Sequence, residues 1–291
     1  MHEWAYLALM SAVMLAAYDI AKKASVKENL VLGVLLGSTI FGSLAFLVVL
    51  FATGRFGAAL QGIDAKVFSL ALIKSGIVAS SWVFTFCALK FLPITIATPI
   101  RSSSPALVFV AALFIYGEVP SLVQALGLML VISGYWLFSS AGKREGIDFL
   151  RNRSVWCAVL GAILSACSSL WDKFVFQVSA LPIPSTQFVY QFGLVAVYAL
   201  LIAIRPLRGK TPFTWRWTIP LVGGFLALSD YLMFNALSYE GVPISVASLV
   251  RRFSVVLTFA FGAIIFKETN LKRKAAALSL VLIGVALLVI K

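Results

Sequence analysis

The sequence has few charged residues, a single histidine and only three cysteines. Charged residues make up 12% of the 291 residues and hydrophobic residues 61%, whereas soluble domains are about one half apolar. This composition excludes a soluble domain and predicts an integral membrane protein. The cysteines are odd in number and lie within apolar segments, so neither a disulfide framework nor a metal site is expected. The one histidine, His2, leaves the interior without a candidate for histidine-dependent catalysis, so we expect no enzyme and no cofactor.

Acidic residues are scarcer than basic ones. The chain has 24 Lys and Arg against 11 Asp and Glu, which gives a net charge of +13. In a soluble protein this excess would suggest nucleic acid, but here the basic residues lie between apolar runs, where a membrane surface accounts for them. Membrane lipid is therefore the expected neighbour, and no nucleic acid is expected.

Ten apolar runs are long enough to cross a bilayer, which takes about 20 residues in a helix. A backbone in lipid must satisfy its own hydrogen bonds, and these long runs leave no room for the short alternating strands of a barrel. The sequence therefore predicts an all-α protein with ten transmembrane helices. The ten runs are residues 4–21, 30–52, 67–92, 94–116, 121–140, 155–178, 185–204, 217–239, 244–266 and 275–290.

The chain contains one unit twice. The stretch PITIATPIRSSSPALVFVAALFIYGE at 93–118 reappears as PISVASLVRRFSVVLTFAFGAIIFKE at 243–268, an offset of 243 − 93 = 150. The matched residues are Pro93 and Pro243, Arg101 and Arg251, Ser104 and Ser254, Glu118 and Glu268, and Gly134 and Gly284. Five helices per unit is an odd number, so the second unit enters the membrane from the opposite side, as in transporters built from inverted-topology repeats.

The longest polar link, 141–153, lies between the fifth and sixth runs and marks the boundary between the units. We therefore predict a first unit at 1–140 and a second unit at 154–291. Most of the 24 basic residues flank the side of the membrane that holds this link, and basic residues concentrate in cytoplasmic loops. The count places the link in the cytoplasm and both termini outside.

The repeated stretches end at 116–118 and 266–268, and each is followed by a helix of small residues with a glycine, Gly134 or Gly284, that permits close helix approach. With these features the chain resembles the drug/metabolite transporter superfamily, and specifically its EamA family of ten-helix carriers. The resemblance implies a secondary carrier for small organic metabolites, often amino acids or drugs that leave a bacterial cell across its inner membrane. It also implies a central cavity lined by the first, third and fourth helices of each unit. Family members usually have cytoplasmic termini, opposite to the charge count.

Two arginines lie inside apolar runs, where an ionisable side chain is costly enough to indicate a functional site. Arg101 and Arg251 are equivalent in the two units, and Ser104 and Ser254 follow them at i+3 on the same helix faces. A guanidinium fork suits a carboxylate or a phosphate. Arg252 adds a second cation in the second unit, and a role in substrate binding is favoured over a position at the interface.

Each unit has one acid near the end of its first helix, at about the depth of one of the arginines. We predict that Asp19 pairs with Arg101 and that Asp172 pairs with Arg251. These pairs are interpreted either as gates that open alternately or as static ion pairs between helices. For Asp19, a local surface pair with the lysines three and four residues after it is the favoured interpretation.

Asp230, in the middle of the eighth run, is the deepest acid. It is interpreted either as a proton carrier that couples transport to a gradient or as a partner for an arginine such as Arg251. Asn235, Gln187 and Gln191 are candidate hydrogen-bonding groups, for the substrate or between helices. Five aromatic residues are candidates for an apolar cavity, although packing is the favoured interpretation. They are Tyr18, Trp82, Phe86, Trp171 and Tyr231.

Two further patterns concern helix ends and breaks. Glu118 and Glu268 are interpreted as structural caps rather than substrate ligands. Pro99 and Pro105 bracket Arg101, and proline inside a helix removes a hydrogen bond and kinks or breaks the helix. The sequence therefore predicts a broken helix at this point in the first unit and an unbroken one in the second.

Together these features predict a monomeric or homodimeric secondary transporter that moves a small carboxylate-bearing solute by alternating access. Export of an amino-acid-like solute, with proton coupling or exchange, is the leading hypothesis. The alternatives are a carrier of phosphorylated metabolites, a carrier of drug-like organic cations with Asp230 as the key acid, and a membrane scaffold or sensor that transports nothing.

Overall fold

The computed structural model describes residues 3–104, 106–108, 110–111, 121–175, 179, 181–204, 212–237 and 244–289. Within these residues every regular element is a helix and no strand is present, which confirms the all-α prediction. The helices are α1 (Glu3–Val26), α2 (Val31–Ala52), α3 (Phe56–Gln61), α4 (Ala65–Phe91), α5 (Ile94–Ser102), α7 (Leu122–Arg144), α8 (Arg153–Lys173), α9 (Ile183–Ile204), α10 (Thr218–Leu237), α11 (Ile244–Ile265) and α12 (Leu271–Val289).

Six helices among the described residues are long and apolar enough to cross a membrane by length and composition, namely α1, α2, α4, α7, α8 and α9. A seventh, α10, has a shorter apolar stretch, Thr218–Met233. A multi-pass membrane protein is thus supported, whereas the count of ten spans stays a prediction. Helix α3 was not predicted from the sequence, because it has only six residues and lies in a connection. Only apolar runs long enough to cross a membrane were identified as helices.

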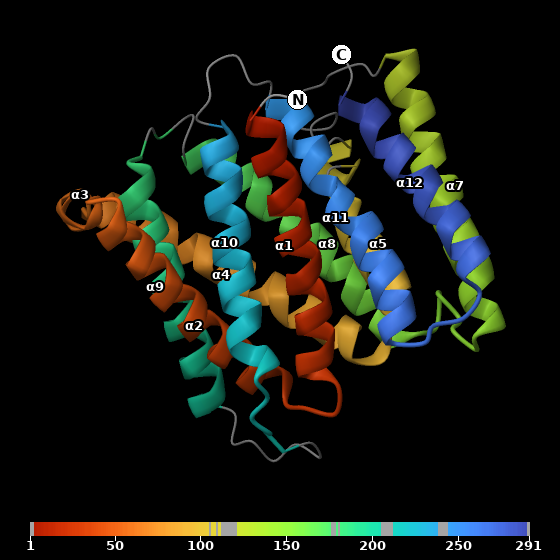
Figure 1. The fold of residues 1–291 in the computed structure, drawn as a ribbon, viewed down its shortest axis with the longest axis horizontal. Coiled ribbons are helices and arrows are strands. Elements are labelled where there is room, and N and C mark those ends of the chain that lie inside the picture. Colours follow the sequence, from red (N-terminus) through yellow and green to blue (C-terminus); the bar gives the residue numbers. More distant parts are fainter. Residues whose placement is uncertain are drawn as a thin grey trace.

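The long helices run roughly along one direction of the molecule (Figure 1). Helix α1 begins and α12 ends at one end of the bundle, which we call the terminal end, and the link between α7 and α8 lies at the other, which we call the linker end (Figure 1). The link and the outer ends of the first and last helices thus lie on opposite sides, as the sequence predicts. Which end faces the cytoplasm stays a prediction.

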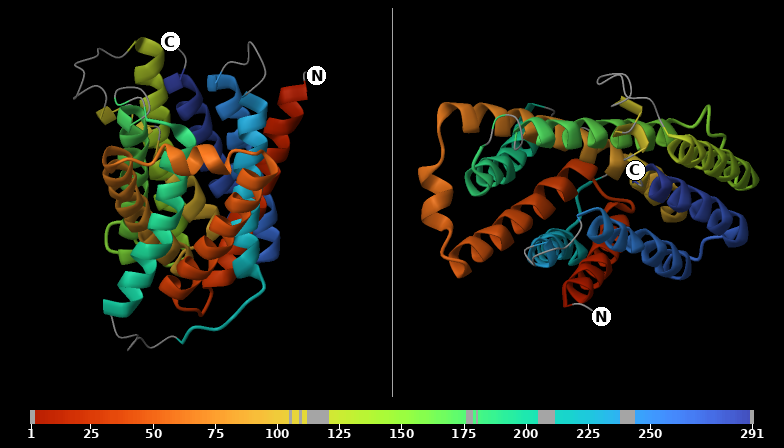
Figure 2. Two further views of the ribbon diagram at one scale, coloured as in Figure 1. Left: turned by 90° about the vertical axis from the view of Figure 1, so that its left-hand side faces the viewer. Right: turned by 90° about the horizontal axis from the view of Figure 1, so that it is seen from above.

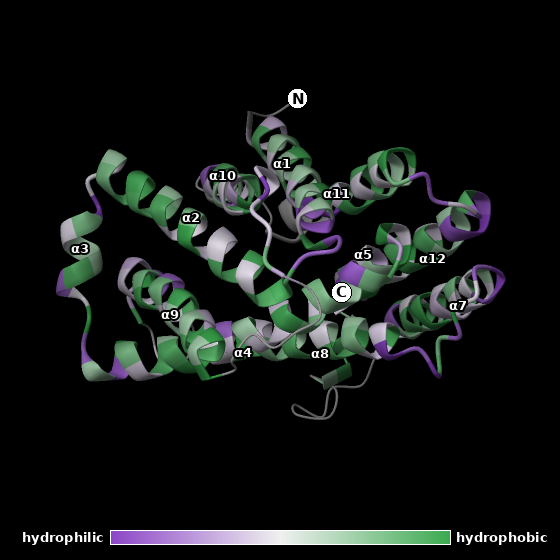
Figure 3. Cartoon of the chain, turned by 90° about the horizontal axis from the view of Figure 1, so that it is seen from below, coloured by the Kyte–Doolittle hydropathy of each residue, from purple (hydrophilic) through white to green (hydrophobic). Residues whose placement is uncertain are grey.

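Three long helix contacts hold the bundle together, between α7 and α12, between α1 and α10, and between α4 and α8. Each of them joins a helix from residues 1–140 to a helix from residues 154–291, so the two predicted units interleave. Viewed along the helices, α4, α8 and α7 form one row and α10, α1 and α11 another (Figure 2). Apolar residues predominate along the helices, and hydrophilic residues gather mainly at helix ends and connections (Figure 3). This distribution fits a bundle surrounded by lipid.

Glycines bring α7 and α12 into close contact. A Cβ atom on Gly284 would lie 2.6 Å from the carbonyl oxygen of Gly127, and one on Gly134 would lie 2.6 Å from the side chain of Val281. The prediction that Gly134 and Gly284 permit close helix approach is confirmed. A larger side chain at either position would have to push the two helices apart.

Helix α5 ends at Ser102, one residue after Arg101, with Pro99 inside the helix. Helix α11 is continuous through Arg251. The predicted break in the first unit and its absence in the second are therefore confirmed, while Pro105 lies outside the described residues. The break leaves Arg101 on the last turn of a short helix, whereas its counterpart lies within a long one.

Candidate substrate site

A small cavity lies among helices from both predicted units. Its volume is about 30 Å³, which is room for about two water molecules at roughly 10–15 Å³ each. Ligand pockets usually measure about 300–1,000 Å³, so a solute could enter only if the surrounding helices moved apart. The lining includes Tyr18 of α1, Ser38 and Thr39 of α2, Trp82 of α4, Gln191 of α9 and Asp230 of α10, together with glycine and aliphatic residues of α2 and α10.

Three of the predicted substrate residues, Tyr18, Trp82 and Asp230, therefore meet at one place, and so does Gln191. The sequence analysis missed Ser38 and Thr39. Their signal was weak, because two adjacent hydroxyl residues in an otherwise apolar run are common in membrane helices and most often bond their own backbone.

The carboxylate of Asp230 is bound by Arg251, which lies on α11. Nη2 of Arg251 donates a hydrogen bond to Oδ1 of Asp230 and another, at 3.1 Å, to the hydroxyl of Ser229. Ser229 in turn exchanges hydrogen bonds with Ser11 of α1, at 2.8 and 2.9 Å. The interpretation of Asp230 as an arginine partner is confirmed, and the predicted pair of Asp172 with Arg251 is wrong. The pair is partly accessible, since the side chain of Asp230 is 36% exposed and that of Arg251 26%.

Asp172 instead forms an ion pair with Lys74, at 2.6 Å from its Nζ. The Lys74 ammonium also lies 4.6 Å from the ring centroid of Tyr190. The prediction failed because it compared depths only, whereas α8, which holds Asp172, packs along α4, which holds Lys74. The sequence offered a signal for this pair, since Lys74 is itself a cation inside an apolar run.

Asp19 pairs with Arg101, as predicted. Nη2 of Arg101 donates to both carboxylate oxygens of Asp19, at 2.7 and 2.9 Å, and Nζ of Lys22 donates to one of them at 2.7 Å. The side chains of Asp19 and Lys22 are each 1% exposed, so the expected surface pair is wrong: the contact is local but buried. Lys23 also differs from expectation, because it donates to the carbonyl oxygens of Leu89 and Leu92 at the end of α4.

The remaining candidates lie away from the cavity. Phe86 is buried in the main hydrophobic core, and the indole of Trp171 donates a hydrogen bond to the carbonyl of Leu70. On α10, Tyr231 is exposed and accepts a hydrogen bond through its carbonyl from the amide of Asn235, at 2.7 Å. Partly buried Ser104 and Arg252 and buried Ser254 do not line the cavity either. For Phe86 and Trp171, packing was therefore the better interpretation.

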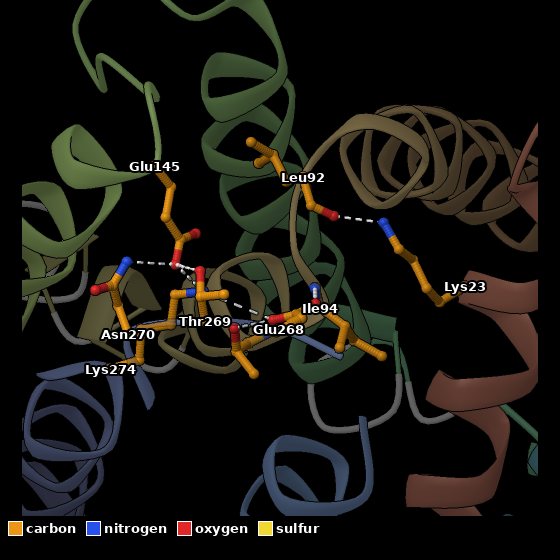
Figure 4. Close-up of polar contacts among 9 residues, drawn as sticks. Lys23, Leu92, Ile94, Glu145, Glu268, Thr269, Asn270 and Lys274 are labelled. Carbon is orange, nitrogen blue, oxygen red and sulfur yellow. Dashed lines mark hydrogen bonds and ion pairs between the residues drawn. The ribbon is translucent and has the colours of Figure 1, made fainter. Parts of the chain in front are cut away.

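At the linker end, Glu268 caps the start of α5, a helix of the other predicted unit (Figure 4). Its carboxylate accepts hydrogen bonds from the backbone amides of Ile94, at 2.6 Å, and Thr95, at 3.2 Å. The interpretation of Glu268 as a structural cap is confirmed, and Glu118 lies outside the described residues. The sequence could not show that the capped helix belongs to the opposite unit.

Next to this cap, Glu145 joins the link to α12 (Figure 4). Its carboxylate lies 2.8 Å from the buried Nζ of Lys274 and accepts hydrogen bonds from Thr269 and Asn270, each at 3.0 Å. Burial raises the pKa of the Glu145 carboxyl, but the ammonium of Lys274 and the two hydrogen bonds outweigh burial, so the pKa lies below its ordinary value of 4.5. Glu145 is therefore a carboxylate at neutral pH and fixes the link to the bundle.

A multi-pass helical bundle with charged groups of both signs beside a cavity is compatible with a membrane transporter of small solutes. The comparison with known families agrees: residues 2–140 match the model of the EamA-like transporter family, so this part of the chain is similar to that family. The match ends at the residue where the repeat predicts the first unit to end.

One relative and one solved structure show further similarity. Over 78 residues the chain is 36% identical to the probable 4-amino-4-deoxy-L-arabinose-phosphoundecaprenol flippase subunit ArnF of Serratia proteamaculans (strain 568). The match takes in 25% of this chain and 60% of that relative. A crystal structure of a protein with 17% sequence identity superposes with a TM-score of 0.64 and covers 99% of this chain and 96% of the other. At that identity the likeness shows the fold alone.

Proposed function

We propose that the protein is a secondary transporter that carries a small amino-acid-like solute by alternating access. The observation that carries this proposal is the cavity between the two units, where the carboxylate of Asp230 shares a lining with Tyr18 and Trp82 and is bound by Arg251. Ionisable groups at membrane depth are costly and mark solute pathways. Charges of both signs beside aromatic side chains suit a small solute that is charged and partly apolar.

The difference between the two ends of the bundle supports alternating access. Near the linker end α1 packs against α4 and α5, and Lys23, Lys90 and Arg216 donate hydrogen bonds to carbonyl groups of other segments there. Helix α8 is the counterpart of α1 in the second unit, yet within the described residues it has hardly any contact with α10 or α11. Inverted repeats in unlike conformations open a carrier to one side at a time. An exchange of the two conformations would move the opening to the other end.

The flippase relative supports a solute that carries two kinds of charge. The name of that flippase describes a molecule with an amino group and a phosphate. Because a guanidinium binds phosphate as well as carboxylate, a carrier of phosphorylated amino compounds is the second candidate. Export from a bacterial cell across its inner membrane, with the link at 141–153 in the cytoplasm and proton coupling or exchange, completes the proposal.

The test is solute counterflow in liposomes that contain the purified protein. Liposomes are loaded with an unlabelled amino acid, an organic phosphate or an organic amine, and uptake of the labelled solute of the same class is measured. We expect counterflow of amino acids, its loss in Asp230→Ala, and no change in the control Asp148→Asn, which alters an exposed acid of the link. Counterflow of organic phosphates alone would establish the second candidate. Absence of counterflow for every class would contradict transport and favour a scaffold or sensor.

A further inference from the structure

We propose that the Asp230–Arg251 ion pair is the binding site for a zwitterion and that the pair opens to receive it. The ammonium group of the solute takes the place of Arg251 on Asp230, and the acidic group of the solute binds the guanidinium that Asp230 releases. This inference rests on the proposed function, because it takes the cavity as the place that the transported solute enters. It deepens that function, because it assigns each charge of the solute to one side chain.

The cavity offers hydrogen-bond acceptors to its contents. The hydroxyls of Ser38 and Thr39 donate to the carbonyl oxygen of Leu35, at 3.1 and 2.8 Å. A hydroxyl has one proton, so while these two bonds are kept, the two oxygens can accept from a group in the cavity but not donate to it. The carboxylate of Asp230 is likewise an acceptor. An ammonium group, which has three donors and no acceptor, fits this lining.

Two aromatic rings in the lining favour the same group. Tyr18 and Trp82 both border the cavity that Asp230 lines. An aromatic face attracts a cation within about 6 Å, and tryptophan does so best. The cavity thus combines a carboxylate, hydroxyl acceptors and aromatic rings, which together recognise an amine.

Arg251 has donors available for an acidic group. Its hydrogen bonds to other described residues, Asp230 and Ser229, come from Nη2. Its buried Nε has no hydrogen-bond partner among the residues that the structure describes. A buried donor without a partner is unfavourable, and a guanidinium binds a carboxylate best through two parallel N–H bonds. A carboxylate along the Nε edge would satisfy this donor and replace the bond to Asp230.

The charges balance before and after such an exchange. The empty site holds one cation and one anion, and a zwitterion adds one of each, so two ion pairs replace one. An amine alone would bind Asp230 and leave Arg251 without its counter-ion, and a carboxylate alone would leave Asp230 without one, so a solute with a single charge would form one ion pair at the expense of another. The site should therefore reject solutes with a single charge.

Accessibility separates this pair from the ion pair of Asp19. The Asp230 carboxylate is 36% exposed and pairs with Arg251, whereas the Asp19 carboxylate is 1% exposed and is bound by both Lys22 and Arg101. A carboxylate held by two cations in a sealed position cannot exchange a partner for a solute. Of these two ion pairs, the Asp230 pair is thus the one whose carboxylate lines the cavity and has a replaceable partner.

The experiment compares three probes that share one ring and differ in charge. Phenylalanine has both charges, phenethylamine only the ammonium, and 3-phenylpropionate only the carboxylate. Their dissociation constants are measured calorimetrically on the purified protein in detergent, and leucine, isopentylamine and 4-methylpentanoate form a second series. We expect the parent to bind the zwitterion at least about tenfold more tightly than either analogue, since a site built for two polar groups rejects a ligand that lacks one.

The variants should change this order in opposite directions. The Arg251→Gln variant leaves Asp230 without its partner, so it should bind the amine most tightly of the three probes. The Asp230→Asn variant leaves Arg251 without its partner, so it should bind the carboxylate most tightly. The matched controls Arg151→Gln and Asp148→Asn, on the exposed link, should keep the order of the parent. Thermal unfolding of each variant shows whether it is folded. If a site variant does not fold, the order of the three probes in the parent decides.

The possible failures are distinguishable. A parent that binds an analogue with one charge as tightly as the zwitterion overturns the inference and leaves the proposed transport intact. If both site variants weaken the binding of all three probes equally, the inference is also overturned and the proposed transport stays intact. A parent that binds no probe of either series overturns the amino-acid-like substrate class together with the inference.

Discussion

Replacement of Asp19 by Asn should destabilise the protein far more than the same replacement at Asp172, its counterpart in the second unit. Asp19 and Lys22 are each 1% exposed, and removal of one partner from a buried ion pair costs about 3–5 kcal/mol because the other charge stays buried. Asp172 is 38% exposed and Lys74 14%, and a pair near solvent contributes only about 0–1 kcal/mol. The two variants should thus differ by at least about 2 kcal/mol.

The assay is denaturant unfolding of the purified variants in detergent micelles, followed by tryptophan fluorescence, with thermal unfolding as a second measurement. A loss of about 3 kcal/mol corresponds to a decrease in Tm of roughly 6–12 °C, at about 2–4 °C per kcal/mol for chains of 150–250 residues. Lys22→Met is the informative companion. It leaves Asp19 paired with Arg101, so it should cost little alone and should restore part of the stability that Asp19→Asn loses.

Two results would refute this reasoning. Equal destabilisation by Asp19→Asn and Asp172→Asn would mean that burial does not decide the cost. A loss in Lys22→Met as large as that in Asp19→Asn would mean that the lysine, rather than the carboxylate between two cations, holds the helices together.

Three other predictions concern packing, pH and capping. Gly284→Ala should lower the free energy of unfolding by about 1–3 kcal/mol through overpacking, because its Cβ would lie 2.6 Å from a carbonyl oxygen of α7. Gly76→Ala is the control, since its Cβ would meet nothing within 4 Å. It should raise the free energy of unfolding by about 0.5–1 kcal/mol, and thermal unfolding measures both variants. Glu145→Gln should lower the free energy of unfolding by about 1–3 kcal/mol at neutral pH. Since the pKa of Glu145 is lowered in the folded protein, its contribution is complete above pH 4.5 and is lost as the pH falls through the folded value, so the variant and the parent should converge in acid. A constant difference down to pH 3 would contradict this. Glu268→Ala should cost about 1–2 kcal/mol through loss of the α5 cap, with faster amide exchange confined to the start of α5 as the signature.

The amino-acid sequence alone determined the class of the protein and its helical segments. A run of apolar residues fixes a helix locally, because each backbone group in lipid must bond within its own segment. The duplication is also a property of the sequence, since it needs only an alignment of the chain with itself. The break after Arg101 followed from its flanking prolines for the same local reason.

For the charged residues, only the depth of each one along its helix could be inferred from the sequence. It sufficed for Asp19 and Arg101, because α1 and α5 meet at the linker end. It failed for Asp172 and Arg251, which lie at similar depths but on helices that are not neighbours. Which of several acids at one depth meets an arginine depends on the rotation and neighbours of each helix, and short-range patterns do not specify these.

The tertiary structure alone decided which residues share the cavity and which helix each cap serves. Ser38 and Thr39 join Asp230 because α2 packs against α10, a contact between segments about 190 residues apart in the chain. Glu268 caps a helix of the opposite unit because the two units interleave. Such contacts arise from the packing of whole helices, to which every residue along the interface contributes, so no local stretch of sequence carries them.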